Sequence, residues 1–208
     1  MITRIDRIPL ALASPFIKEH HYSHGHHGGP SPCVGAFDAN DRLVGVCMFA
    51  TPCSENVRAK PFGWEERDRV TELHRLALLD ECPRNSESTM ISASLRILLS
   101  YKPQIRCVVS FADPTQGHLG TIYQATNFLY TGRSGRATFY LDSDGRLRHP
   151  RQNGVNITSE DALRLGWTPT QRDGKMRYIM VIAPDRRERR FWQERLSFSS
   201  LPYPKVIA

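Results

Sequence analysis

The spacing of apolar residues predicts two elements in the first quarter of the chain. Apolar positions at helical spacing favour a helix over residues 10–22, which the Gly and Pro residues that follow would end. Two apolar runs on either side of residues 38–41 predict a β-hairpin over 33–52. The stretch 57–69 is polar except for Trp64, and it predicts a long loop.

The middle of the chain alternates strand and helix patterns. We expect strands at 70–79 and 105–112 and helices at 85–102 and 118–130, which together form a βαβα unit. Later elements are a strand within 137–149 with a turn at Asp144 and Gly145, a helix at 158–165, a strand at 176–183 and a C-terminal helix. This order predicts an α/β fold with a mixed central sheet flanked by helices.

Length and charge set the first limits on function. The 208 residues fit a single domain, 1–208, with a basic C-terminal segment at about 184–208. The 28 Lys and Arg against 21 Asp and Glu give a net charge of +7. This excess favours an anionic partner, and nucleic acid, a phosphorylated cofactor and a membrane surface all remain open.

The number of cysteines and the hydropathy of the chain bear on its cellular compartment. Five cysteines are an odd number and form no C-x-x-C motif, and no signal peptide precedes them. This pattern predicts reduced thiols in a cytoplasm. No apolar run approaches the roughly 20 residues that span a bilayer, so we expect a soluble protein without a membrane partner.

The stretch "PRNSES" at 83–88 opens the helix that follows the first central strand. Free backbone N–H groups and the positive end of the helix dipole attract phosphate at such a position. Arg84, Asn85, Ser86 and Ser88 are therefore candidates for binding a cofactor. Simple N-capping by Asn85 or Ser86 is the alternative interpretation.

Several motifs in the chain resemble those of known protein families, one broad and one narrower. "IYQATNF" resembles the tyrosine-bearing helix of GNAT-type acyltransferases, with Tyr123 and Phe128 at the matching positions. More widely, "ELHRLALLDECPRNSES", "SFADPTQGHLGTIYQATNFLYTG", the early "HYS" and the terminal "PYPK" resemble the Mom DNA-modification proteins of Mu-like phages. The similarity runs from about residue 15 to the end of the chain.

This resemblance implies a GNAT-like enzyme of an infected bacterial host cell. It would add a carbamoylmethyl group to adenine N6 in double-stranded DNA and so protect the DNA from host restriction. The resemblance also implies iron and a donor cofactor. The donor would be an acyl or aminoacyl compound; acetyl-CoA is in doubt, because residues 84–88 lack the glycines of the usual pyrophosphate loop.

Catalytic roles follow from the same comparison. Tyr123 would be a general acid. Asn127, one turn further along the expected helix, would contact the donor or the substrate amide, or would only cap a turn. Glu72 would be a general base, although a carboxylate at a strand end is often only solvated. Tyr22 would stack on a flipped adenine or contact it.

The segment "HHYSHGHH" at 20–27 has the imidazole density of a transition-metal site, or of a solvated loop. We expect a narrower set in which His21 and Asp113 hold the metal, with His118 or Tyr22 as a further ligand. His118 could instead form hydrogen bonds at the start of the following helix. We interpret His74 as a packed residue.

DNA contacts are expected from two arginine groups. Arg133 and Arg136 follow the Tyr123 segment, and the C-terminal helix carries Arg186, Arg187 and Arg190. Arginine contacts to phosphate give affinity without sequence information. Two other functions remain open at this stage: an acetyl-CoA-dependent N-acetyltransferase of a protein or small amine, and a basic DNA-binding protein without enzymatic activity.

Overall fold

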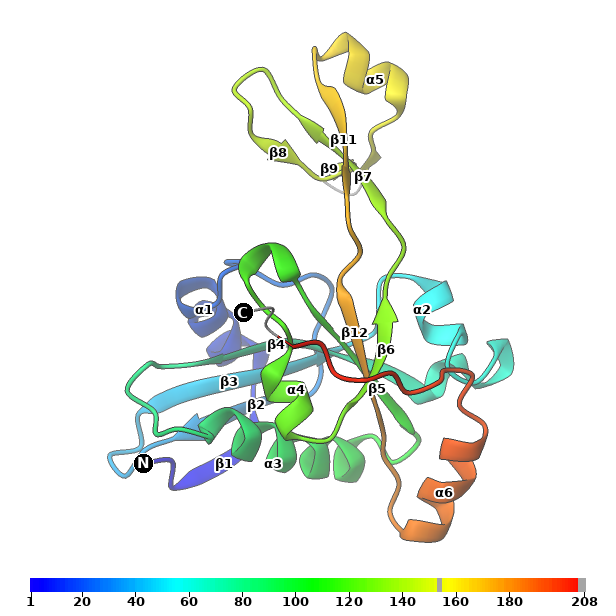
Figure 1. The fold of residues 1–208 in the computed structure, drawn as a ribbon. Helices are drawn as coiled ribbons and strands as arrows, with labels where there is room; N and C mark the ends of the chain where they lie inside the picture. The colour runs from blue at the N-terminus through cyan, green and yellow to red at the C-terminus, as the bar shows by residue number, and fades with distance from the viewer. Residues whose placement is uncertain (153–154, 206–208) are drawn as a thin grey trace.

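The computed structural model describes residues 1–152 and 155–205, and its centre is a seven-stranded sheet (Figure 1). The strands lie in the order β1-β2-β3-β4-β5-β12-β6. Their bounds are Arg4–Ile8, Cys33–Phe37, Leu43–Ala50, Val70–Leu78, Cys107–Ala112, Met176–Val181 and Leu129–Arg133, in that order. Neighbours are antiparallel except β4 and β5, which run parallel. The expected mixed sheet is confirmed.

Helices cover both faces of the sheet (Figure 1). They are α1 (Leu10–His20), α2 (Glu55–Ala59), α3 (Ser86–Tyr101), α4 (Thr121–Ala125) and α6 (Arg186–Glu194). Apolar residues of α1 pack with Val46 and Met48 of β3, whereas α3 packs with Cys47 and Phe49 on the opposite face. Because β3 is buried on both faces, its sequence is a continuous apolar run.

Within residues 1–152 and 155–205, no helix is long and apolar enough to cross a bilayer.

An arm projects from one end of the central sheet (Figure 1). Its strands are β7 (Ala137–Leu141), β8 (Leu147–Arg148) and β11 (Thr168–Arg172), and it also contains β9 (Arg151–Gln152), β10 (Val155–Asn156) and α5 (Ser159–Arg164). The predicted turn at Asp144 and Gly145 is confirmed between β7 and β8, with Gly145 at φ 74°.

The arm is continuous with the central sheet at its base. β6 pairs with β12 in the sheet and β7 pairs with β11 in the arm. Between these two pairs the Ser134 N–H donates to the Lys175 carbonyl at 2.8 Å. A Cβ on Gly174 would lie 1.7 Å from the Ser134 carbonyl oxygen, so this close approach requires glycine.

Several predicted elements agree with the structure and others are wrong. The hairpin, both central strands, and the helices expected at 10–22, 85–102 and 158–165 are present within a few residues of their predicted ends. The helix expected over 118–130 is present but shorter than predicted, because only Thr121–Ala125 is helical and β6 follows. The loop expected over 57–69 is wrong in part, because α2 and a 3₁₀ turn occupy much of it. Strands β1 and β11 were not predicted.

Candidate active site

A cavity of about 590 Å³ lies where β4 and β5 separate. These strands pair only over Val70–Glu72 and Cys107–Val109, and beyond these residues they diverge. The cavity is lined by the rest of β4, the end of β5, the C-terminal turn of α1 and the segment 117–123. Its volume is in the range typical of small-molecule and cofactor sites.

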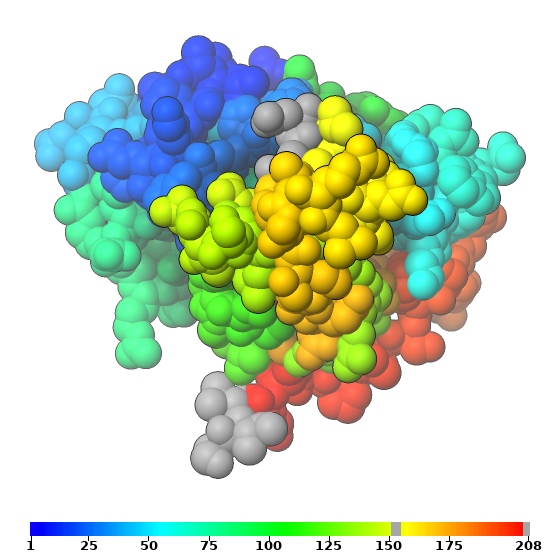
Figure 2. Space-filling view, turned by 90° about the horizontal axis from the view of Figure 1, so that it is seen from above, coloured from blue at the N-terminus to red at the C-terminus, as the bar shows by residue number. Residues whose placement is uncertain are grey.

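The base of the arm contributes Lys175 to the cavity lining. Figure 2 looks down on this end of the molecule, and the yellow and orange arm stands between the blue N-terminal region and the cyan segment around α2. Any large substrate that approaches from this side therefore meets the arm.

His74 reaches the cavity because β4 contains a bulge. Met48 pairs with Arg75 and Phe49 pairs with Leu73, so His74 has no partner on β3. A bulge re-aims a side chain and is common beside active sites. His74 and Arg75 consequently both line the cavity, although adjacent residues of a regular strand point to opposite faces.

Tyr123 is a buried residue of the cavity wall. Its ring lies 5.5 Å from Phe128 and 5.2 Å from Tyr178, and Ser110 is a neighbour of its hydroxyl. Ser110 donates from Oγ to the Leu73 carbonyl at 2.9 Å. Burial raises the pKa of Tyr123 above its usual range. The hydroxyl is therefore protonated at neutral pH, which is the form that a general acid needs.

The turn after α1 brings His21 and Tyr22 to the same cavity. The Tyr22 ring lies 4.4 Å from His21 and 5.3 Å, edge-on, from His118. Burial, followed by the nearby Arg75 charge, lowers the pKa of His21 to about 4, so its imidazole is uncharged at neutral pH. Tyr22 is 44% exposed, which leaves its ring accessible to a ligand.

Asp113 directly follows the last residue of β5, Ala112, but its carboxylate has other partners than those expected. Oδ1 accepts hydrogen bonds from the Thr115 N–H at 3.0 Å and hydroxyl at 2.6 Å, and Lys175 Nζ lies 3.7 Å from Oδ2. Burial opposes ionisation, but these partners outweigh it and lower the pKa of Asp113. Asp113 therefore caps the turn at Pro114–Gln116, and it is not among the residues that line the cavity.

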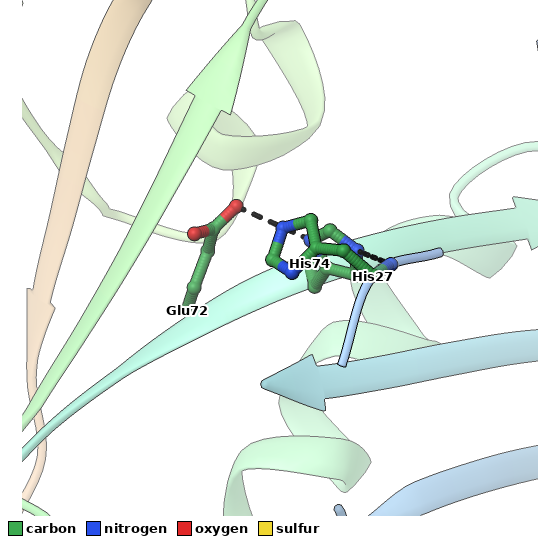
Figure 3. A group of neighbouring side chains, drawn as sticks. All are labelled: His27, Glu72 and His74. Atoms are coloured by element: carbon green, nitrogen blue, oxygen red, sulfur yellow. Dashed lines mark hydrogen bonds and ion pairs between the residues drawn. The ribbon is translucent and has the colours of Figure 1, made fainter. Parts of the chain in front are cut away.

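Another group of potential ligands lies at the bulge (Figure 3). His27, Glu72 and His74 present ligating atoms that all lie within 4.8 Å of one another, and this is the one group of three such residues in the described part of the chain. His21, Asp113 and His118 do not form such a group. These three do not fit one shared ion in this arrangement, and their role as ligands stays a prediction.

The predicted donor-binding residues lie at the start of α3. Asn85 is the residue before the helix, at φ 69°, and its side chain makes no capping hydrogen bond, so the capping interpretation is not supported for this residue. Arg84 is exposed, Ser86 is buried and Ser88 is half-buried. The cavity reaches this helix at Glu87. Binding of a donor by Arg84, Asn85, Ser86 and Ser88 stays a prediction.

Asn127 is not on the helix face expected for it. The helix ends at Ala125, and Asn127 has a left-handed backbone with φ 62° that turns the chain into β6. Asn127 is also not among the residues that line the cavity. Its predicted place one helical turn from Tyr123 is wrong.

The two arginine groups lie at different ends of β12. Arg133 and Arg136 are exposed at the base of the arm, where both face Asp173 at 3.6 and 3.0 Å. Arg186, Arg187 and Arg190 are exposed on α6, beyond the opposite end of the six-residue strand (Figure 1). Six residues of strand span roughly 20 Å, so α6 is the more distant group from the cavity.

The sequence did not indicate how three of these residues lie. His74 is buried, which agrees with its interpretation as a packed residue, but its place beside His27 and Glu72 was not predicted. His27 was counted in a segment interpreted either as a metal site or as a solvated loop, and Lys175 was not considered. The spacing of Glu72 and His74 two residues apart on one strand could have indicated that they share a face. No sequence pattern indicates that His27 meets them.

The chain matches the Mom protein family over residues 3–205. It is 31% identical, over 97% of its length and 83% of the relative's, to the methylcarbamoylase mom of Escherichia phage Mu. Similar solved structures include an Acinetobacter baylyi protein described as an acetyltransferase, with 12% identity, TM-score 0.49 and coverage of 87% and 93% of the two chains. A phosphinothricin acetyltransferase of the GNAT superfamily from Sinorhizobium meliloti, solved with AcCoA, has 12% identity, TM-score 0.47 and coverage of 88% and 90%.

Proposed function

Because the chain belongs to the Mom protein family, we propose that it is a transferase that adds a carbamoylmethyl group to adenine N6 in DNA. The observation that carries this proposal is the cavity between β4 and β5, with protonated Tyr123 in its wall and Glu72 on the adjoining strand. This combination offers a space for a donor, a proton donor and a carboxylate, as a group transfer to nitrogen requires.

The reaction joins a carbon atom to N6 and releases a leaving group. Adenine N6 is a weak nucleophile because its lone pair is delocalised into the ring. Glu72 would accept the proton that N6 loses, and Tyr123 would protonate the leaving group. Each positioned proton transfer contributes typically 10²–10⁴ to the rate.

The adenine must leave the duplex to reach this cavity. An enzyme that acts on a base within a duplex flips it into a pocket, where aromatic side chains stack on it. Tyr22 is the exposed aromatic side chain of the lining, and its ring already contacts His21 and His118. We assign Tyr22 the role of stacking on the flipped base.

The charge at the start of α3 bears on the choice of donor. Glu87 lines the cavity in the first turn of α3, and its negative charge opposes a pyrophosphate at the helix start. Acetyl-CoA is accordingly disfavoured. Attack of N6 on the carbonyl of an aminoacyl ester would form an amide, so we propose a donor whose methylene carbon carries the leaving group: the N6–CH2 bond forms as the bond to that group breaks, Glu72 takes the proton from N6, and Tyr123 gives one to the leaving group.

The direct test is mass analysis of nucleosides from plasmid DNA co-expressed with the protein. We expect a modified deoxyadenosine with the mass of one added carbamoylmethyl group. An acetylated protein or small amine with unmodified DNA would indicate an N-acetyltransferase instead. DNA that binds the protein but stays unmodified would indicate a binding protein.

Salt dependence of DNA binding distinguishes the two arginine groups. If phosphates bind near the cavity, Arg133→Ala with Arg136→Ala should weaken binding to all sequences and reduce the slope of log K against log salt by up to about 2. The matched pair Arg187→Ala with Arg190→Ala on α6 should then leave the slope unchanged. Fluorescence anisotropy with duplexes of two sequences measures both, and the reverse result would place the DNA along α6.

A further inference from the structure

We propose that Arg172 and Lys175, at the base of the arm, bind the DNA phosphate next to the adenine that enters the cavity. This inference rests on the proposed function, because it concerns where that substrate lies on the protein. Lys175 lines the cavity, and Arg172 is the last residue of β11, three positions earlier in the chain. The connection from β11 to β12 forms the base of the arm (Figure 1). The two cations therefore stand at the rim of the cavity.

Both cations contact the turn that follows β5. Arg172 donates from Nη2 to the hydroxyl of Thr115, and Lys175 Nζ lies 3.7 Å from Asp113 Oδ2. The Thr115 hydroxyl donates in turn to Asp113 Oδ1 at 2.6 Å. These four side chains form one connected cluster, which we call the arm-base cluster. The turn leads directly into residues 117–123 of the cavity lining.

The arm-base cluster carries more positive than negative charge, because its two cations share one carboxylate. The Lys175 side chain is 52% exposed, so its ammonium group is accessible to a ligand, whereas that of Asp113 is 13% exposed. Arg133 and Arg136 at the same end of the arm likewise share one carboxylate, that of Asp173. This excess of positive charge favours an anion that arrives at the base of the arm.

The guanidinium of Arg172 is held in position for such an anion. Its Cζ lies 5.3 Å from the centre of the Phe139 ring. Phe139 pairs with Thr170 across the arm, and Thr170 and Arg172 are two residues apart, so the ring and the guanidinium share one face of the arm sheet. Arginine binds phosphate through two parallel N–H groups of a planar fork, and a fork fixed beforehand loses less entropy on binding.

The position of the cluster favours the DNA backbone over a phosphate of the donor. When a base flips into a pocket, its sugar and the flanking phosphates stay at the rim. Lys175 lines the cavity, but Arg172 is not among the lining residues. A donor enclosed in the cavity would therefore meet Lys175 alone, whereas a phosphate at the rim would meet both cations. The effect of substituting Arg172 distinguishes the two sources.

The test measures binding of a duplex that contains one adenine, placed opposite an abasic site so that extruding the base costs less. Arg172→Ala and Lys175→Met should each weaken binding roughly tenfold, as expected for loss of a charged hydrogen bond. Each should also reduce the slope of log K against log salt by about 1. Arg164→Ala is the matched control, because Arg164 is exposed on α5 of the same arm and pairs with Glu160 of its own helix. It should change neither quantity in fluorescence anisotropy.

Replacement of single phosphates by uncharged methylphosphonate locates the contact. In the wild type, replacement of one of the two phosphates that flank the adenine should weaken binding roughly tenfold, the same charged contact being lost. In Arg172→Ala and in Lys175→Met the same replacement should have little further effect, because a partner of that phosphate is already absent. Full wild-type sensitivity to this replacement in both variants would overturn the proposal.

A purely structural role gives a different result. If Arg172 only fastens the arm to Thr115, Arg172→Ala would lower Tm and leave the affinity for DNA unchanged, which would also contradict the proposal. Unchanged affinity for DNA in Arg172→Ala, with a loss in Lys175→Met alone, would contradict a site made by both cations. These measurements need no reaction. A wild type that leaves co-expressed plasmid DNA unmodified would refute the proposed function, whereas unchanged binding by both variants would refute only the phosphate site.

Discussion

Tyr123→Phe should lower the yield of modified adenine by about 10²–10⁴-fold, as expected for removal of a positioned general acid. The hydroxyl that this substitution removes belongs to a residue of the cavity wall, with Ser110 as its neighbour. The ring, which packs against Phe128 and Tyr178, is preserved. Stability should fall by only about 0.5–1.5 kcal/mol, the net contribution of one hydrogen bond.

Tyr130→Phe is the matched control for this experiment. Tyr130 also stacks on Tyr178, at 5.4 Å, but it is not among the cavity-lining residues. It should keep near-normal modification in the same nucleoside mass analysis. Comparable yields from Tyr123→Phe and wild type would reject the acid role and leave Tyr123 as a packing residue.

Gly120→Ala should destabilise the protein by roughly 2–5 kcal/mol, from left-handed backbone strain and overpacking together. Gly120 has φ 74°, and a Cβ there would lie 2.3 Å from the ring of Tyr178. Tyr178 cannot move away easily, because it is fully buried and its hydroxyl donates to the Leu119 carbonyl. Because Tyr178 stays in place, the backbone at Gly120 would move instead. This movement would displace residues 117–123 of the cavity lining, which include His118.

Gly117→Ala separates the two contributions. Gly117 has nearly the same backbone, φ 72°, but a Cβ there would meet nothing within 4 Å. It should cost only the backbone term, about 1–2 kcal/mol. For a chain of this size each kcal/mol lowers Tm by about 2–4 °C, which calorimetry resolves. Equal Tm values for the two variants would mean that Tyr178 does not restrict this position.

Strong local patterns account for the elements that were predicted correctly. Helix α3 has an apolar face and strand β5 is continuously apolar, so each is visible in a short window of sequence. β1 has only one fully buried residue and lies at the sheet edge. The end of α4 depends on the positive φ of Asn127, which no periodicity indicates. That residues 1–208 form one domain stays a prediction, and residues 206–208 of the expected C-terminal segment lie outside the described residues.

The sequence could place those site residues that lie at the end of a strand or in the turn beside it. Tyr123, Tyr22 and Glu72 all line the cavity, as expected for residues at the end of a diverging strand pair and the turn beside it. The meeting of His27 with His74 could not be predicted, because it needs a bulge on β4 and a loop contact between residues 47 positions apart. Such contacts are set by tertiary packing and leave no local pattern.

The continuity of the arm with β6 and β12 has a consequence for how the chain can change. The two strands leave the sheet side by side, so residues 134–175 behave as one long connection between neighbouring strands. The entropic cost of closing such a connection grows only with the logarithm of its length, about 0.6 kcal/mol for each doubling. Insertions and deletions at the tip of the arm should therefore leave the cavity intact. The part of the protein that a long substrate meets first can be lengthened, shortened or replaced independently of the part that performs the reaction.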